Sequence, residues 1–388
     1  MFELKNLMAA GAFALTTMTT GQIAVAQDNL IDLPIAGTLP VSGPISDVYL
    51  GLVRASMMAL EDNADKLAAA GWRIPENGEF NVEDTLQKVD RGIPTMQLQL
   101  GRGAQIISSL ITPIVIAQAQ LALRSNALIF GSYMQGPNLD DLDNFLVGMM
   151  LADIEAKPLG NFAATVLGAK TAAVIYVDDE YGSLTAESFE KSYTEGGGEV
   201  ALRLAIPANP TDFRNESVRV SIADPDVVFI IHRGGYSLAI ETLRDAGYDG
   251  MLLSGSAALV AGRITPVAAE GEGMILSTIT GSTEARETFI KRYEERWNTP
   301  LPAESALIPY AGTEVLVAAL ANVPATNDLD VEDIEAAWMA LGKVQTLVGE
   351  ATVTGRSVVY PINLEKVEPN GDLVVIGSCD ETTCTAQN

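Results

Sequence analysis

The fold is decided by a stretch in the middle of the chain, Thr171–Tyr193, which reads TAAVIYVDDEYGSLTAESFEKSY. Its opening run is apolar and predicts a strand buried on both faces, while the residues from Ser183 on have helical spacing. Between the two segments stand three acids, a tyrosine and a glycine (DDEYG). Asp179 or Glu180 can stabilise the positive N-terminal end of the helix, but this explanation leaves Tyr181 without a structural role.

The same alternation of strand and helix recurs on both sides of this stretch. Before residue 150 the apolar runs DLPIAGTLP, AQIISSLI and ALIFGSY alternate with helical segments, and after residue 150 the pattern starts again. Apolar strands separated by helices indicate a parallel sheet covered on both faces. The 388 residues therefore predict an α/β protein with two doubly wound parallel-sheet lobes. In the tail, Asn370-Gly371 predicts a hairpin whose strands join a sheet already built.

The N-terminus and the overall charge restrict where the protein works. Residues 1–26 resemble an export signal, with Lys5, an apolar run and an A-x-A pattern ending at Ala26, where we expect cleavage. An ordinary amphipathic first helix is the alternative. The net charge of −26 argues against nucleic acid and anionic membrane surfaces as partners.

The only two cysteines, Cys379 and Cys384, lie five positions apart near the C-terminus. An exported protein meets an oxidising environment, so we expect a small local disulfide. A metal pair is the weaker alternative, because the sole histidine, His232, is far away in the sequence.

Candidate site residues follow from the positions of the strand ends, because ligands of open α/β sheets bind beyond the carboxyl ends of the strands. Thr112 before Pro113 predicts an N-cap whose free N–H groups suit a carboxylate, and a purely structural cap is the equal alternative. Arg233 is a second candidate carboxylate partner, or else a partner of surface acids. The remaining candidates at strand ends are Ser132, Tyr133, Tyr181, Tyr236 and Ser256.

Catalytic and phosphate-binding motifs are missing from the sequence. There is no G-x-S-x-G, H-E-x-x-H or phosphate loop, and His232 has no acid that the sequence places beside it. A single histidine at a strand end is more often structural or incidental. We therefore expect no enzyme activity, no cofactor and no metal.

The order and spacing of these marks resemble a type I periplasmic solute-binding protein of ABC transporters, in the branched-chain amino acid (leucine-binding) family. The resemblance runs from about Asp32 to about Gly377 and rests on GTLPVSGPISDVYLG, IISSLITPI, AAVIYVDDEYG, NPTDFR, DPDVVFIIHRGGYS, LRDAGYDGMLLSGS and YAGTEVLVAAL. It implies two lobes joined by three crossing segments, with a ligand in the cleft between them. The implied lobes are 27–151 with 278–352, and 152–277 with 353–388, after a signal peptide at 1–26.

The resemblance also implies residue roles. The hydroxyl that receives the ligand carboxylate falls on Thr112, the strand-end contacts fall on Ser132 and Tyr133, and the tyrosine that faces the cleft falls on Tyr181. Small hydroxyl or glycine residues usually flank the first of these positions, whereas this chain has Ile111 and Pro113 there.

A second departure concerns the ligand's charge. Family members that bind amino acids place an acid beside the last cleft strand to receive the ligand's ammonium, and this chain has Ser256 there. A serine cannot neutralise an ammonium, and a buried unpaired charge is costly. The expected ligand is a carboxylate without an α-amino group, or an amino acid whose amine is met by Asp179 or another acid.

These observations predict a monomeric binding component of an ABC importer. It would capture a small carboxylate-bearing solute in the periplasm and deliver it to permease subunits in the inner membrane. The alternative is a ligand-sensing module that reports to a membrane receptor, and an enzyme ranks third.

Overall fold

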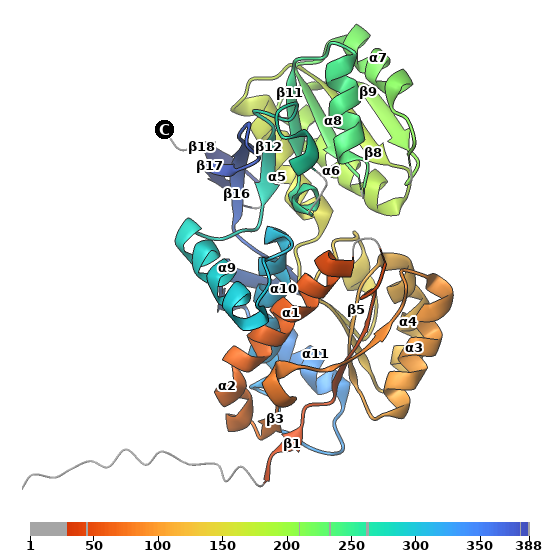
Figure 1. Cartoon of the computed structure of the whole chain (residues 1–388), viewed down its shortest axis with the longest axis vertical. Helices are drawn as coiled ribbons and strands as arrows, with labels where there is room; N and C mark the ends of the chain where they lie inside the picture. Colours follow the sequence, from red (N-terminus) through yellow and green to blue (C-terminus); the bar gives the residue numbers. More distant parts are fainter. Residues whose placement is uncertain are drawn as a thin grey trace, which may run out of the picture.

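The computed structural model describes residues 29–43, 46–208, 210–232, 234–260, 264–380 and 382–386. Two sheets stand one above the other, each with helices against it (Figure 1). The expected signal sequence and Arg233 lie outside the described residues. No helix in the described part of the chain combines the length and apolar character needed to cross a bilayer.

The first sheet has five parallel strands in the order β4-β2-β5-β6-β7. These strands are β2 (Ile35–Leu39), β4 (Asn81–Asp84), β5 (Ile106–Ser109), β6 (Leu128–Gly131) and β7 (Phe145–Val147). β2 and β5 in its centre are buried along their whole length, as their apolar sequences predict. A separate small pair, β1 (Ile31–Asp32) and β3 (Trp72–Arg73), lies near the N-terminus.

Helices from both ends of the chain cover this sheet. The early ones are α1 (Ser46–Asp62), α2 (Ala64–Ala69), α3 (Val89–Gly101) and α4 (Thr112–Arg124). The late ones are α9 (Thr283–Trp297), α10 (Leu307–Leu320) and α11 (Val331–Met339). α10 lies along α1, so the chain returns to the first sheet after building the second (Figure 1).

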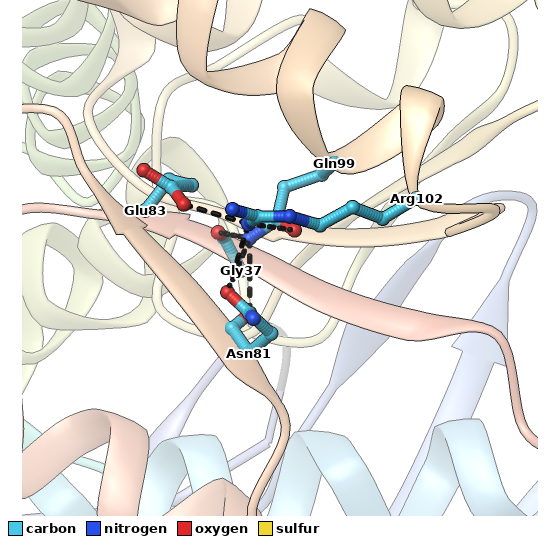
Figure 2. A network of polar contacts seen from close by, with 5 residues as sticks. All are labelled: Gly37, Asn81, Glu83, Gln99 and Arg102. Atoms are coloured by element: carbon cyan, nitrogen blue, oxygen red, sulfur yellow. Dashed lines mark hydrogen bonds and ion pairs between the residues drawn. The ribbon is translucent and has the colours of Figure 1, made fainter.

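One polar network fixes α3 over the edge of this sheet (Figure 2). The buried Gln99 donates from Nε2 to the carbonyl oxygens of Gly37, at 2.9 Å, and Asn81, at 3.1 Å. Arg102, one turn later, donates to Glu83 Oε1 at 2.7 Å. These contacts hold β2 and β4 in position, and the carboxyl ends of both strands point toward the second lobe.

The second sheet has eight strands in the order β18-β17-β16-β12-β11-β10-β8-β9. Its parallel part comprises β8 (Thr171–Val177), β9 (Glu199–Ile206), β10 (Val227–Ile231), β11 (Met251–Ser254) and β12 (Ile275–Thr278). Alternate residues of β10 enter two different cores, Val227 and Phe229 in one and Val228 and Ile230 in the other. This alternation is why the strand is apolar at every position.

Helices cover both faces of the second sheet. α5 (Ala152–Thr165) and α6 (Glu180–Glu195) pack together on one face, and α7 (Arg214–Ala223) and α8 (Tyr236–Asp245) pack on the other. Short 3-10 helices complete the described structure: η2 (Glu76–Gly78), η3 (Leu139–Asp141), η4 (Ser256–Leu259), η5 (Thr265–Val267) and η6 (Glu304–Ala306).

The tail joins the second sheet through antiparallel strands. β16 (Ile362–Val367) pairs with β12, β17 (Leu373–Cys379) with β16, and β18 (Cys384–Ala386) with β17. The predicted hairpin at Asn370-Gly371 is confirmed, with Gly371 at a φ of 86°. The structure joins Cys379 to Cys384 by a disulfide across β17 and β18.

A three-stranded sheet precedes the last passage between the lobes. It comprises β13 (Lys343–Thr346), β14 (Gly349–Thr354) and β15 (Ser357–Val359), and β15 lies against β7 of the first sheet. The predicted boundary at 352/353 falls inside β14, and the passage to the second sheet comes after β15. The boundaries at 151/152 and 277/278 stay predictions.

Candidate functional site

A cavity of about 530 Å³ lies between the carboxyl ends of the strands of the two sheets. Its walls come from both lobes: Val48, Tyr49, Leu52, Gln87, Leu110, Ile111, Thr112, Tyr133, Met134, Gln135, Gly136, Tyr181, Ala208, His232, Gly234, Ala257 and Val260. None of these described lining residues is an Asp, Glu, Lys or Arg. The cavity has the size typical of small-molecule sites and an apolar, aromatic wall with few polar groups.

Thr112 stands at the start of α4 and lines the cavity. The prediction that it is the N-cap is wrong by one residue, because the N-cap is Ile111 and Thr112 is the first helical residue. Ile111 has a φ of 74°, which turns the chain sharply into the helix. The Thr112 side chain therefore does not cap the helix, and neither its hydroxyl nor its N–H has a hydrogen-bond partner among the described residues.

The segment after β6 forms the adjacent wall. Tyr133 lines the cavity, whereas Ser132 is buried beneath it. Gly136 lies close to Thr112: a Cβ on Gly136 would be 3.2 Å from Thr112 Oγ1. The absence of a side chain there keeps space free beside the threonine hydroxyl.

Tyr181 supplies an aromatic wall from the second lobe. It sits in the first turn of α6, is 6% exposed and lines the cavity. Asp179 is the N-cap of that helix and accepts a hydrogen bond from the Gly182 N–H at 2.9 Å. The acids in DDEYG therefore include the helix cap, as predicted, and the tyrosine faces the space between the lobes.

His232 ties two loops of the second lobe together and lines the cavity. Its Nδ1 accepts hydrogen bonds from the N–H groups of Gly234, at 3.2 Å, and Gly235, at 3.0 Å. Nε2 therefore carries the proton and donates to the Pro207 carbonyl oxygen at 3.0 Å. Both ring nitrogens are therefore bonded within the protein, and a ring in this state is a poor general base.

Tyr236 lies away from the cavity. It is fully buried in the core between α8 and the sheet, and its hydroxyl accepts a hydrogen bond from the His232 N–H and lies 3.3 Å from Ser254 Oγ. The helix start places this ring inward because α8 packs on the sheet through the same face.

Ser256 also lies away from the cavity and binds a buried acid that sequence reasoning missed, Glu155 of α5. The Ser256 N–H and Oγ donate to Glu155 Oε1 at 2.6 and 2.7 Å. Ser277 Oγ donates to the same oxygen at 3.2 Å, and Gln135 Nε2 donates to Oε2 at 2.7 Å. Burial raises the pKa of Glu155, and these hydrogen bonds work in the opposite direction.

Comparison with known proteins gives this geometry a context. The sequence profile of the periplasmic binding protein family matches residues 32–370. Leu/Ile/Val-binding protein homolog 7 of Brucella melitensis biotype 1 is 24% identical over 366 residues, which cover 81% of this chain and 89% of that protein.

Two solved structures have the same fold. One is the solute-binding protein of an ABC transporter from Rhodopseudomonas palustris BisB5, solved with 3,4-dihydroxybenzoic acid, with a TM-score of 0.77 at 18% identity; the match covers 92% of this chain and 98% of that one. The other is LivJ from Streptococcus pneumoniae, solved with isoleucine, with a TM-score of 0.75 at 15% identity and coverage of 92% and 100%. The predicted two-lobed α/β fold is thereby confirmed.

Proposed function

Because this chain belongs to the periplasmic binding protein family, we propose that it is the periplasmic solute-binding component of an ABC importer. It captures a small carboxylate-bearing organic solute in the cleft between its lobes and delivers it to permease subunits in the inner membrane. The observation that carries the proposal is the cavity at the strand ends, whose apolar wall includes the hydroxyl of Thr112. The lobes close around the solute by a hinge motion about the crossing segments.

The start of α4 is the proposed carboxylate site. A helix N-terminus favours an anion, and the Thr112 hydroxyl and N–H have no partner among the described residues. Gly136 leaves room beside this hydroxyl. Thr112, Tyr133 and Tyr181 are therefore our proposed ligand contacts. Contacts from Ser132, Tyr236 and Ser256 are predictions to which the geometry adds no support, and the predicted contact from Arg233 lies outside the described residues.

The cleft favours a carboxylate without an α-amino group. Glu155 lies behind the cavity wall, bonded to the lining residue Gln135, but it accepts hydrogen bonds from four donor groups of the protein. A carboxylate has about four acceptor sites, so Glu155 has none left for an ammonium. The lining includes three tyrosines, which suits an aromatic ring. An arene carboxylate fits both features, and one structural neighbour was solved with 3,4-dihydroxybenzoic acid.

A thermal-shift screen of the mature protein tests this proposal. The panel contains benzoate, 4-hydroxybenzoate, benzamide, 4-methylpentanoate and leucine, which separate the contributions of ring, carboxylate and amine. A ligand at a hundredfold excess over its Kd stabilises the folded state by about 2.7 kcal/mol. We expect the arene carboxylates to raise the melting temperature, and benzamide and leucine to leave it unchanged. A shift with leucine alone would contradict the proposed ligand class, and the absence of any shift would contradict the carboxylate site.

A further inference from the structure

Gln135 connects the cavity to the buried acid behind it. It follows β6, is half-buried and lines the cavity. Its Nε2 donates to Glu155 Oε2 at 2.7 Å and to Ser256 Oγ at 3.2 Å. An amide NH₂ group has two hydrogens, so both donors of this side chain point toward the second lobe.

The orientation of this amide is fixed by Glu155. The Ser256 N–H donates to Glu155 Oε1 at 2.6 Å, and the Ser277 hydroxyl donates to the same oxygen, so the carboxyl group is held in one rotation. Turning the Gln135 amide over would bring its Oε1 against Glu155 Oε2, where two acceptors would repel each other. The hydrogen bonds thus decide which end of the amide faces Glu155.

The other end of the amide is therefore an acceptor directed away from Glu155. No described residue donates to Gln135 Oε1, and this atom is not sealed in the interior. Because Gln135 lines the cavity, Oε1 is available to a donor on a bound solute. An apolar ligand that covered this carbonyl would leave it without a hydrogen bond, which is unfavourable.

We propose that Gln135 is a specificity-determining residue that selects arene carboxylates bearing a hydroxyl group, by accepting a hydrogen bond from that hydroxyl at Oε1. The inference rests on the proposed function and narrows its ligand class. Glu155 acts as a positioning residue, because it touches Gln135 and not the ligand. The carboxylate binds at Thr112, and the ring hydroxyl binds at Gln135.

Isothermal titration calorimetry with matched ligands tests the inference. The pairs are 4-hydroxybenzoate with 4-fluorobenzoate and 3-hydroxybenzoate with 3-fluorobenzoate, since fluorine is close in size to a hydroxyl but donates no hydrogen bond. We expect the wild-type protein to bind the hydroxyl member of at least one pair about tenfold more tightly. In Gln135→Met this preference should fall below about threefold, while the affinity for the fluoro compound changes little.

Two further variants separate positioning from packing. Glu155→Gln removes the group that holds the amide in one orientation, so the preference for the hydroxyl ligand should fall although the Gln135 side chain is intact. Gln87→Met changes another glutamine of the same wall and should alter both affinities together, leaving their ratio as in the wild type. Melting temperatures of the unliganded variants check that each one folds.

The outcomes separate this inference from the proposed function. If the wild-type protein binds arene carboxylates but does not distinguish hydroxyl from fluorine, or if Gln135→Met keeps the preference, the inference is wrong and the proposed function stands. If no arene carboxylate binds, the inference and the arene ligand class are both wrong, and a thermal shift with 4-methylpentanoate would still support a carboxylate site. If Gln135→Met failed to fold, Glu155→Gln would test the same inference, because a hydroxyl preference that stayed at the wild-type ratio in that variant would contradict it.

Discussion

Two regions of the molecule each bury a glutamate, and they do so in different ways. Glu155 lies behind the cleft and is 2% exposed, and Glu365 of β16 lies beside the crossing segments and is 0% exposed. Glu365 faces a cation, because Arg286 Nη1 of α9 approaches its Oε1 to 2.8 Å. Glu155 instead accepts hydrogen bonds from hydroxyl, amide and backbone N–H groups of the described residues.

The difference follows from what each region has to do. The chain crosses to the first lobe between β12 and α9, and it crosses back to the second lobe between β15 and β16. The ion pair between Arg286 and Glu365 joins α9 to β16 across these two crossings. Asn363 Nδ2 adds a 2.7 Å hydrogen bond to the Gly281 carbonyl oxygen. If the solute carries a carboxylate, as we propose, a cation beside Glu155 would stand near the cleft and compete with Thr112 for that carboxylate. Neutral donors hold Glu155 in place without introducing such a charge.

We expect the largest loss of stability when the ion pair between Arg286 and Glu365 is broken. Arg286→Leu leaves the Glu365 carboxylate buried without its cation, which typically costs about 3–5 kcal/mol of the free energy of unfolding. Denaturant titration of the purified variant measures this loss. As a control, Arg73→Leu removes one partner of the exposed pair with Asp32 and should leave stability unchanged within error. If the two substitutions lowered the free energy of unfolding equally, the ion pair between Arg286 and Glu365 would have no special structural role.

We expect a smaller loss of stability when a hydrogen-bond donor to Glu155 is removed. Ser256→Ala removes a hydroxyl that lies 2.7 Å from both oxygens of a buried carboxylate, and we expect a loss of about 2 kcal/mol in the free energy of unfolding. Ser254→Ala is the matched control, because that hydroxyl donates to a neutral acceptor, the Ile230 carbonyl oxygen, at 2.7 Å. The control should lose about 1 kcal/mol. A smaller loss in Ser256→Ala than in Ser254→Ala would show that Glu155 does not depend on its serine.

The smallest expected effect is a dependence of the free energy of unfolding on pH. Burial raises the pKa of Glu155 above its ordinary value of 4.5, so the folded state keeps this proton to a higher pH than the unfolded state does. The free energy of unfolding of the wild type, relative to Glu155→Gln, should therefore fall as pH rises from about 4.5 toward the folded-state pKa. One proton limits the slope to about 1.4 kcal/mol per pH unit. Unfolding curves at pH 4–8 measure this difference, and parallel behaviour of the two proteins would refute it.

Local patterns could be predicted from the sequence. The strand and helix around Tyr181 follow from apolar runs and helical spacing, and Asp179 serves as the cap because capping depends on residues three positions apart. The predicted N-cap, Thr112, differs by one position from the observed N-cap, Ile111. The positive φ of Ile111 could not be predicted, because β-branched residues rarely adopt such a conformation.

The buried cluster could not be predicted, because its contacts are distant in the sequence. Glu155 and Ser256 are 101 positions apart, and only the packing of α5 against the second sheet brings them together. From the sequence alone, a glutamate on a predicted helix such as Glu155 is expected to face solvent. Ser256 was singled out because it stood where an acid was expected, and the structure shows an acid from another helix bonded to it. The sequence thus indicated the position but not the group that occupies it.

The most direct test of the account is a crystal structure of the protein with the arene carboxylate that gives the largest thermal shift. We predict that a carboxylate oxygen of the ligand lies within hydrogen-bond distance, about 3 Å, of Thr112 Oγ1, with the ring between Tyr133 and Tyr181. Glu155 should keep its hydrogen bonds to Ser256 and Gln135. A ligand whose carboxylate binds only the second lobe, or an amine bound to Glu155, would contradict the central claim that this cleft holds a carboxylate at the start of α4.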